Sequence, residues 1–237
     1  MKVILVDIEG TITDIDFVKQ TLFPYASQNL ARYVREQTAL NNPQVQTILD
    51  DTLAFWKNEQ TDPHLKQDPT VDDLIQILLS WIDADRKITP LKTLQGLIWE
   101  HGYTSGDFTG HLYEDAYTYL KKWKDQGLRL AVYSSGSEYA QKLLLGHSDY
   151  GDLTPWFEAY FDTRVGAKRE AQAYGNILKA LGLDNEAHQV LFLSDVVQEL
   201  DAAHQVGMKT YELRRDQQEG SSHHPVASHF EHIDRTL

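Results

Sequence analysis

Apolar residues follow two alternating patterns along the chain: short continuous runs and stripes with helical spacing. The first run, Val3–Val6, is rich in β-branched residues and predicts a strand buried on both faces, as in a parallel sheet. The predicted strands are Val3–Val6, Leu128–Tyr133, Phe157–Asp162, Val190–Leu193 and Met208–Leu213, the last being the final strand. Helical stripes separate the later strands, at Tyr113–Gln126, Glu138–Leu145, Ala171–Leu181 and Val196–Val206. This alternation predicts an α/β fold with a doubly wound parallel sheet.

Between about residue 15 and residue 105 the pattern is helical throughout, and no segment reads as a core strand. A stripe begins at Phe17, and Pro24 should bend or interrupt it. Further helices are expected at Val45–Glu59, Val71–Asp85 and Pro90–His101, separated by the breakers Asn41-Asn42-Pro43 and Thr61-Asp62-Pro63. We therefore predict a core formed by residues 1–14 and 106–237, with a helical cap, residues 15–105, inserted after the first strand. Gln217–Pro225 reads as a surface loop before a short ordered end.

Composition and charge narrow the classes of partner. The 237 residues carry a formal net charge of −13 and the sequence pI is about 5.1, which argues against nucleic acid or an anionic membrane as the main partner. The chain has no cysteine, no signal-like start and no apolar run of membrane-spanning length. We expect a soluble, cytoplasmic protein.

Polar side chains that suit a single chemistry follow three of the predicted strands. Asp7 and Glu9 follow the first, Ser134 and Ser135 the second, and Asp195 comes after Val190–Leu193. Because open parallel sheets bind ligands at the carboxyl ends of their strands, these side chains should share one crevice. Lys168 lies in a loop between the last two strand ends.

This set of residues fits phosphoryl transfer. Carboxylates from separate strands suit Mg²⁺, and the Ser134 hydroxyl with the following amides suits phosphate oxygens, to which Lys168 adds a positive charge. Asp7 beside Mg²⁺ would act as the nucleophile, and Glu9 would protonate the leaving oxygen.

Plainer interpretations stand beside these. Asp195 is also a suitable cap for the following helix, Ser134 a turn residue, and Lys168 one half of a solvated charge pair with Arg169. Glu199 and Asp201 are expected to favour their helix amino terminus or to hold neighbouring site groups, in preference to binding metal. The ten histidines show no metal spacing, and His223-His224 is expected to be solvated.

Four motifs in this order resemble those of the haloacid dehalogenase superfamily. They are Asp7-Ile-Glu-Gly-Thr11, Ser134-Ser-Gly-Ser137, Gly166-Ala-Lys168 and Phe192-Leu-Ser-Asp195. Glu9, in place of the usual second Asp, makes the chain similar to the enolase-phosphatases of methionine salvage. So do Phe17-Val-Lys…Leu22-Phe-Pro-Tyr25, Ala140-Gln-Lys-Leu143…Gly146-His-Ser148, Phe161-Asp-Thr163 and Glu199-Leu-Asp-Ala-Ala203.

The resemblance implies a bifunctional enzyme. It would enolise 2,3-diketo-5-methylthiopentyl-1-phosphate and then hydrolyse the phosphate, leaving the acireductone 1,2-dihydroxy-3-keto-5-methylthiopentene. It further implies one Mg²⁺ per subunit held by Asp7, Glu9 and Asp195, with Ser134, Ser135 and Lys168 binding substrate, and a monomer. Whether Glu9 binds metal through its main chain or its side chain stays open. The group that removes the carbon-bound proton is likewise open, and Glu9 is our hypothesis because its extra methylene extends its reach.

Other functions compete with this interpretation. A simple Mg²⁺-dependent phosphatase acting on a small sugar or glycolate phosphate would use the same residues without enolisation. A metal-independent dehalogenase would leave Asp195 without a role, and a catalytically silent sensor of a phosphorylated metabolite would not need Asp7. The thioether end of the substrate is apolar, and Phe17, Phe23 and Tyr25 near the start of the helical insertion are candidates for a lid wall.

Overall fold

The computed structural model describes residues 1–59, 69–215 and 222–236. The chain forms two compact units, one made of Met1–Phe17 with Thr109–Leu237 and the other of Val18–Phe108. Each unit has a hydrophobic core of its own. Two predicted features, the Thr61-Asp62-Pro63 breaker and residues 217–221 of the surface loop, lie outside the described residues.

The larger unit is built on a six-stranded parallel sheet with the strand order β3-β2-β1-β4-β5-β6. The strands are β1 Val3–Val6, β2 Arg129–Tyr133, β3 Phe157–Phe161, β4 Val190–Ser194, β5 Lys209–Leu213 and β6 Val226–Ala227. All four residues of β1 are buried, and Val3 pairs with both Arg129 and Val190. The first strand of the sequence is therefore an interior strand of the sheet. The predicted α/β class with a parallel sheet is confirmed.

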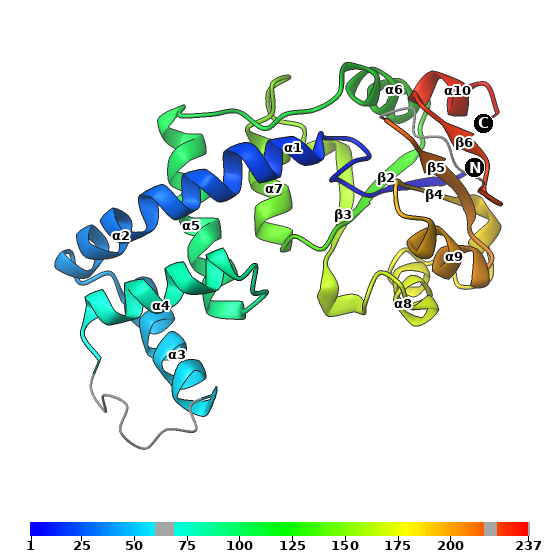
Figure 1. Cartoon of the computed structure of the whole chain (residues 1–237). Helices are drawn as coiled ribbons and strands as arrows, with labels where there is room; N and C mark the ends of the chain where they lie inside the picture. Colours follow the sequence, from blue (N-terminus) through cyan, green and yellow to red (C-terminus); the bar gives the residue numbers. More distant parts are fainter. Residues whose placement is uncertain (60–68, 216–221, 237) are drawn as a thin grey trace. The chain divides into compact units, whose positions relative to one another are not determined.

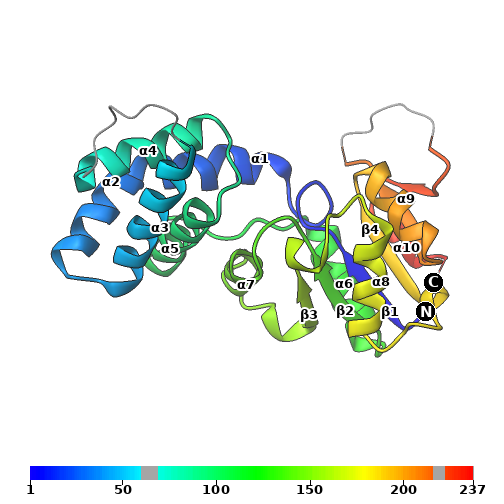
Figure 2. The ribbon, with the colours of Figure 1, turned by 90° about the horizontal axis from the view of Figure 1, so that it is seen from below.

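Helices cover both faces of this sheet (Figure 1). Their bounds are α6 Glu114–Asp125, α7 Glu138–Gly146, α8 Ala171–Ala180, α9 Val197–Gln205 and α10 Phe230–Asp234. Because strand side chains alternate, Ile4 and Val6 face a core that includes Trp123 of α6 and Phe230 of α10. Val3 and Leu5 face the opposite core, which contains residues of α8 and α9. Figure 2 shows the unit from the side of α8 and α9.

The second unit is helical. It contains a π-helical turn, Val18–Leu22, followed by α2 Phe23–Ala39, α3 Pro43–Glu59, α4 Val71–Asp83 and α5 Thr89–Ser105. The short helix α1, Ile15–Phe17, belongs to the larger unit. The predicted interruption near Pro24 is confirmed, because the π-helical turn Val18–Leu22 ends just before Pro24, which lies in the first turn of α2. The core of this unit includes Leu30, Leu78 and Leu94.

The prediction that Met208–Leu213 forms the final strand is wrong. A sixth strand, β6, pairs in parallel with β5 through Glu212↔Val226 and Leu213↔Ala227, and α10 follows it. β6 has only two residues, which is too short to show the alternation that a sequence pattern needs. No helix among the described residues is both long and apolar enough to span a membrane.

Candidate active site at the Asp7 edge of the sheet

The peptide that follows β1 turns sharply and brings Asp7 against the end of β4. The Asp7 N–H donates to the Leu193 carbonyl at 2.9 Å, which extends the pairing of β1 with β4 by one residue. The chain then closes a tight turn in which the Ile8 carbonyl accepts from the N–H groups of Ile12 and Thr13. Asp7 is thereby held by rigid backbone, and its side chain is buried.

Gly10 of this turn places the backbone directly against the carboxylate of Asp195. Its φ of 74° lies in the left-handed region, which favours glycine. A Cβ at this position would lie 2.3 Å from Asp195 Oδ2. The glycine therefore permits the close approach of the Asp7 turn and Asp195, as expected for residues that follow the neighbouring strands β1 and β4.

Lys168 is buried between two carboxylates. Its Nζ lies 2.6 Å from Asp7 Oδ1 and 2.7 Å from Glu199 Oε2, and the residue is 8% exposed. The Tyr174 hydroxyl donates to the Lys168 carbonyl at 2.8 Å, and the Tyr133 hydroxyl donates to the Gly166 carbonyl at 2.9 Å. These bonds fix the loop that carries the lysine. The alternative of a solvated charge pair with Arg169 is wrong.

Glu199 supports this arrangement from the first turns of α9. Besides its ion pair with Lys168, its Oε2 accepts a hydrogen bond of 3.0 Å from the Ser194 hydroxyl. The expectation that Glu199 holds neighbouring site groups is confirmed. The helix itself begins after Val196, where no side chain caps it, and the Val196 N–H donates to Ser194 Oγ at 3.1 Å. The alternative role of Asp195 as the helix cap is therefore wrong.

Ser134 and Ser135 follow β2, the other neighbour of β1. Ser134 is buried, its N–H donates to the Phe161 carbonyl at 3.1 Å, and its Oγ accepts from the Gly136 N–H at 3.1 Å. The interpretation of Ser134 as a turn residue is thus correct, because its Oγ accepts from the N–H group two residues further on. Ser135 is exposed.

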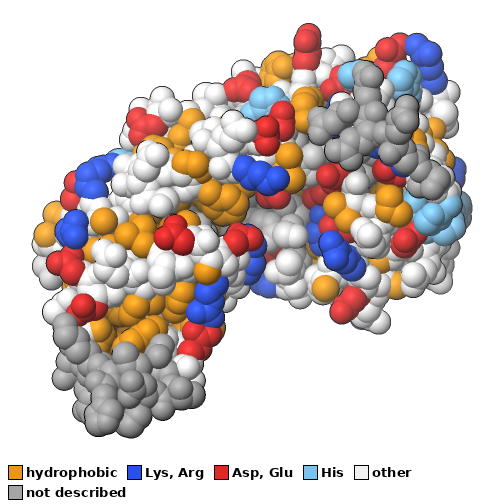
Figure 3. All heavy atoms as spheres, in the orientation of Figure 1, with side chains coloured by type: hydrophobic (Ala, Val, Ile, Leu, Met, Phe, Trp, Pro, Cys, Tyr) orange, Lys and Arg blue, Asp and Glu red, His pale blue; other side chains and the backbone are white. Residues whose placement is uncertain are grey.

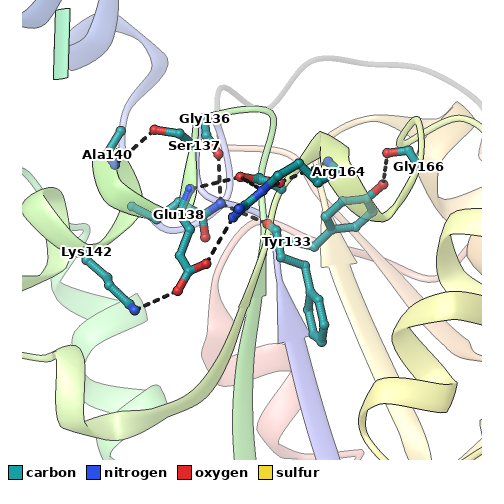
Figure 4. A network of polar contacts seen from close by, with 11 residues as sticks. Tyr133, Gly136, Ser137, Glu138, Ala140, Lys142, Arg164 and Gly166 are labelled. Atoms are coloured by element: carbon teal, nitrogen blue, oxygen red, sulfur yellow. Dashed lines mark hydrogen bonds and ion pairs between the residues drawn. The ribbon is translucent and has the colours of Figure 1, made fainter. Parts of the chain in front are cut away.

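A polar network outside the predicted site holds the loop that contains these serines (Figure 4). Asp162 accepts hydrogen bonds from the N–H groups of Glu138 and Arg164 and pairs with the Arg164 guanidinium at 2.9 Å. Glu138 in turn pairs with Arg164 at 3.0 Å and with Lys142 at 2.7 Å. The Gln141 side-chain amide donates to the carbonyls of Gly136 and Phe161, both at 2.8 Å. The loop is therefore pre-ordered by the ends of β2 and β3.

Negative charge exceeds positive charge at this edge of the sheet. Burial, and then the nearby charge of Asp7, raise the pKa of Asp195 to about 7. Burial and the charge of Asp7 also raise the pKa of Glu199, against the opposing charge of Lys168. Burial alone would lower the pKa of Lys168, but Asp7 and Glu199 outweigh it and raise it. Three acids surround a single ammonium, so the site favours a further cation.

The donor set suits Mg²⁺. Asp7 and Asp195 offer carboxylate oxygens from neighbouring strands, and Mg²⁺ is commonly held by one or two carboxylates with several waters. Glu9 is half-buried in the turn, where its backbone pairs with that of Thr13. Among the described residues, Asp7, Glu9 and Asp195 do not form a group whose three ligand atoms all lie within 4.8 Å of one another. This leaves open whether Glu9 contributes its side chain or its main-chain oxygen.

Known proteins are similar to this chain over most of its length. A model of the haloacid dehalogenase-like hydrolase family matches residues 1–207. The enolase-phosphatase E1 of Thioalkalivibrio sulfidiphilus is 51% identical over 230 residues, which cover 97% of each chain. That of an Enterobacter species is 48% identical over 98% of this chain and 96% of its own. The chain belongs to the enolase-phosphatase E1 family of haloacid dehalogenase-like hydrolases. The predicted superfamily and family are confirmed.

A solved structure is also similar to this chain over nearly its full length. The UTR4 protein of Saccharomyces cerevisiae is 35% identical, with a TM-score of 0.80 over 97% of this chain and 98% of its own. In the present chain, the sequence did not reveal that Tyr133 and Tyr174 anchor the Lys168 loop or that Asp162 pairs with Arg164. The signal for Asp162 was its position at a strand end, shared with Asp7 and Asp195.

Proposed function

We propose that this family member converts 2,3-diketo-5-methylthiopentyl-1-phosphate to its acireductone by enolisation followed by dephosphorylation. The single observation that carries the proposal is the buried Lys168 ammonium, held between Asp7 and Glu199 at 2.6 and 2.7 Å. A fixed positive charge beside a strand-end carboxylate suits a reaction in which a phosphate anion must approach a nucleophilic anion.

In the proposed dephosphorylation, an Asp7 carboxylate oxygen attacks phosphorus and the bond between phosphorus and the enol oxygen breaks. Glu9 supplies a proton to the departing oxygen, and the aspartyl-phosphate that forms on Asp7 is then hydrolysed by water. Lys168 balances the charge of Asp7 and of the phosphate oxygens. Ser134 and Ser135, at the end of β2, are the proposed phosphate-binding residues, because main-chain amides before a helix suit an anion.

In the proposed enolisation, a proton leaves the carbon next to a carbonyl while negative charge grows on the carbonyl oxygen. Glu9 is the proposed base, and the Lys168 ammonium is the proposed positive charge that stabilises the enolate. Asp7, Glu9 and Asp195 would hold Mg²⁺, which when bound polarises the substrate oxygens. The excess of buried carboxylate over ammonium at this edge supports that assignment.

The test follows enol absorbance and phosphate release together, using a 2,3-diketo-1-phosphohexane analogue with Mg²⁺. An enol that rises and then decays as phosphate appears, both absent from Asp7→Asn or without Mg²⁺, is the expected result. Phosphate release from simple sugar phosphates without an enol signal would move the function to a plain phosphatase. If Glu9→Gln abolished dephosphorylation but left enolisation intact, the role of Glu9 as base would fail.

We further propose that residues 15–105 act as the cap of a cytoplasmic, monomeric enzyme that holds one Mg²⁺. The helical unit Val18–Phe108 has its own core, which suits a separate substrate-covering role. Phe23→Ala should raise KM for the methylthio substrate more than for a shorter diketone phosphate, if this unit recognises the thioether. Light scattering and metal analysis of the purified protein test the monomer and the stoichiometry.

A further inference from the structure

Two adjacent histidines and an aspartate converge on α9, away from the residues assigned above. Asp201 Oδ1 lies 2.5 Å from His223 Nε2 and 3.0 Å from His224 Nε2. Metal ligands in proteins are commonly His, Cys, Asp and Glu. Within residues 1–59, 69–215 and 222–236, this is the one group of three such side chains whose ligand atoms all lie within 4.8 Å of one another. Histidine side chains are visible on the surface in the region of α9 and β5 (Figure 3).

The expectation that His223-His224 is solvated is wrong for His224. The His224 side chain is 2% exposed and that of His223 is 66% exposed. His224 is buried because the chain that leads into β6 lies beside α9 and β5, and this pairing was not apparent in the sequence. A buried imidazole with its Nε2 aimed at a carboxylate is oriented before any ligand arrives.

A hydroxyl fixes the His224 ring from its other side. Thr210 Oγ1, on β5, lies 2.8 Å from His224 Nδ1. A hydroxyl can donate to Nδ1 when the proton is on Nε2, and can accept from Nδ1 when Nε2 is bare. The Thr210 hydroxyl is therefore compatible with the tautomer that leaves Nε2 free to bind a metal, and it orients the ring as outer partners of metal-bound histidines commonly do.

The plainer interpretation is a pair of hydrogen bonds in which both rings donate to Asp201. That interpretation directs two imidazole donors to the same carboxylate oxygen. The same three atoms need only small shifts to become metal ligands, because a tetrahedral Zn²⁺ site with bonds of about 2.0 to 2.1 Å separates its ligand atoms by about 3.3 Å.

We propose that Asp201, His223 and His224 bind a borderline divalent transition-metal ion of the Zn²⁺ class. Two imidazole nitrogens and one carboxylate select such ions over Mg²⁺, which prefers oxygen ligands. The site is therefore chemically distinct from the carboxylate site at Asp7. The bound ion would join α9, which also carries Glu199, to the segment that enters β6.

The test titrates Zn²⁺ calorimetrically into the chelator-treated full-length protein with Mg²⁺ in large excess, so that the Asp7 edge is occupied. The wild type is expected to bind one Zn²⁺ per chain. His223→Asn and Asp201→Asn should weaken that binding by about tenfold or more, since each removes one of three ligands. His223 is exposed, so His223→Asn should fold normally. His232→Asn is the matched control, because His232 is an exposed histidine outside the site.

X-ray absorption of the Zn²⁺-loaded protein should show nitrogen scatterers at about 2.0 Å with imidazole features, which His223→Asn reduces. Zn²⁺ should also raise the thermal midpoint of the wild type and of His232→Asn, and raise that of His223→Asn by less at the same Zn²⁺ concentration. Wild type that binds no Zn²⁺ under excess Mg²⁺ would overturn the proposal. So would unchanged affinity in both ligand variants, because any Zn²⁺ binding would then lie elsewhere, for example at Asp7.

Discussion

At the scale of single residues, the chemistry of the site depends on close approaches that only particular side chains allow. Asp7, Asp195 and Lys168 were predictable from sequence, because strand ends of a parallel sheet meet at one edge and each residue stands beside such an end. The contact of Glu199 with Lys168 and the burial of His224 were less accessible. The first depends on how α9 is rotated against the sheet and the second on the chain that leads into β6, and local pattern specifies neither.

Gly10→Ala should impair the site through Asp195. The substitution forces an L residue to a φ of 74°, which costs about 1 kcal/mol, and places a methyl group 2.3 Å from Asp195 Oδ2. We expect weaker Mg²⁺ activation and a further loss of stability as Asp195 shifts, measured by activity against Mg²⁺ concentration and by urea unfolding.

Gly106→Ala is the matched control for this variant. Gly106 has a φ of 75°, and a Cβ there would meet nothing within 4 Å. Gly106→Ala should lose the same backbone free energy as Gly10→Ala but keep the Mg²⁺ response of the wild type. Equal Mg²⁺ responses in the two variants would show that the approach of Gly10 to Asp195 has no effect on the site.

Lys168→Met should lower kcat/KM by about a thousandfold or more, because it removes the only cation paired with Asp7 in the described contacts. It also leaves Asp7 and Glu199 facing each other without a shared partner, so some loss of stability should accompany it. Steady-state kinetics and circular dichroism measure the two effects. Arg169→Met, which changes an exposed neighbouring cation, should leave kcat/KM nearly unchanged, and a comparable fall there would contradict the role of Lys168.

At the scale of elements, apolar runs in the sequence predicted five of the strands. The sixth strand was not predicted, because it is too short to form such a run. β1 to β5 have four or five residues each, long enough to appear as runs, whereas β6 has two residues and is recognised only from its pairing with β5. The helices predicted at Val45–Glu59 and Val71–Asp85 have limits within two residues of those of α3 and α4.

The loop after β2 should show a dependence on acid that comes from Asp162. Burial raises the pKa of this group, but hydrogen bonds and charge from Arg164 outweigh it and lower the pKa below its ordinary value. A lowered acid pKa stabilises the folded state above the ordinary value, and this contribution is lost as pH falls through the folded pKa. Asp162→Asn should therefore cost about 2 kcal/mol near neutral pH and progressively less below about pH 4.

Urea unfolding of the wild type and Asp162→Asn across this pH range measures the difference. Asp184→Asn, at an exposed position, serves as the control and should change stability little at any pH. A cost of Asp162→Asn that stayed constant down to about pH 3 would show that the Asp162 charge is not what holds the loop.

At the scale of the whole molecule, two hydrophobic cores divide the chain between them. The core of the helical unit draws its buried residues from positions 26 to 98, and those of the sheet unit come from the remainder. The sequence indicated this division, because helical periodicity replaces strand runs between the first and second strands. Acidic and basic side chains are interspersed on the face shown in Figure 3.

Leu78→Ala should destabilise the helical unit selectively, by about 3 kcal/mol, because Leu78 is fully buried in its core. Hydrogen exchange should rise in peptides of α2 to α5 and stay unchanged in β1 and β2. Leu130→Ala, buried in the sheet unit, should show the reverse distribution. An equal rise in both units from either variant would mean that they unfold together.

The interior position of β1 also sets an order of events during synthesis. Val3 cannot pair in the sheet until Arg129 and Val190 have been made, and these follow it by 126 and 187 residues (129 − 3 and 190 − 3). At typical translation rates of about 5 to 20 residues per second, the second partner emerges roughly 10 to 40 s after the first strand. The helical unit ends at Phe108 and is complete in the meantime. Asp7 is thus made well before Asp195, and its place in the site is fixed only after both partner strands of β1 have emerged.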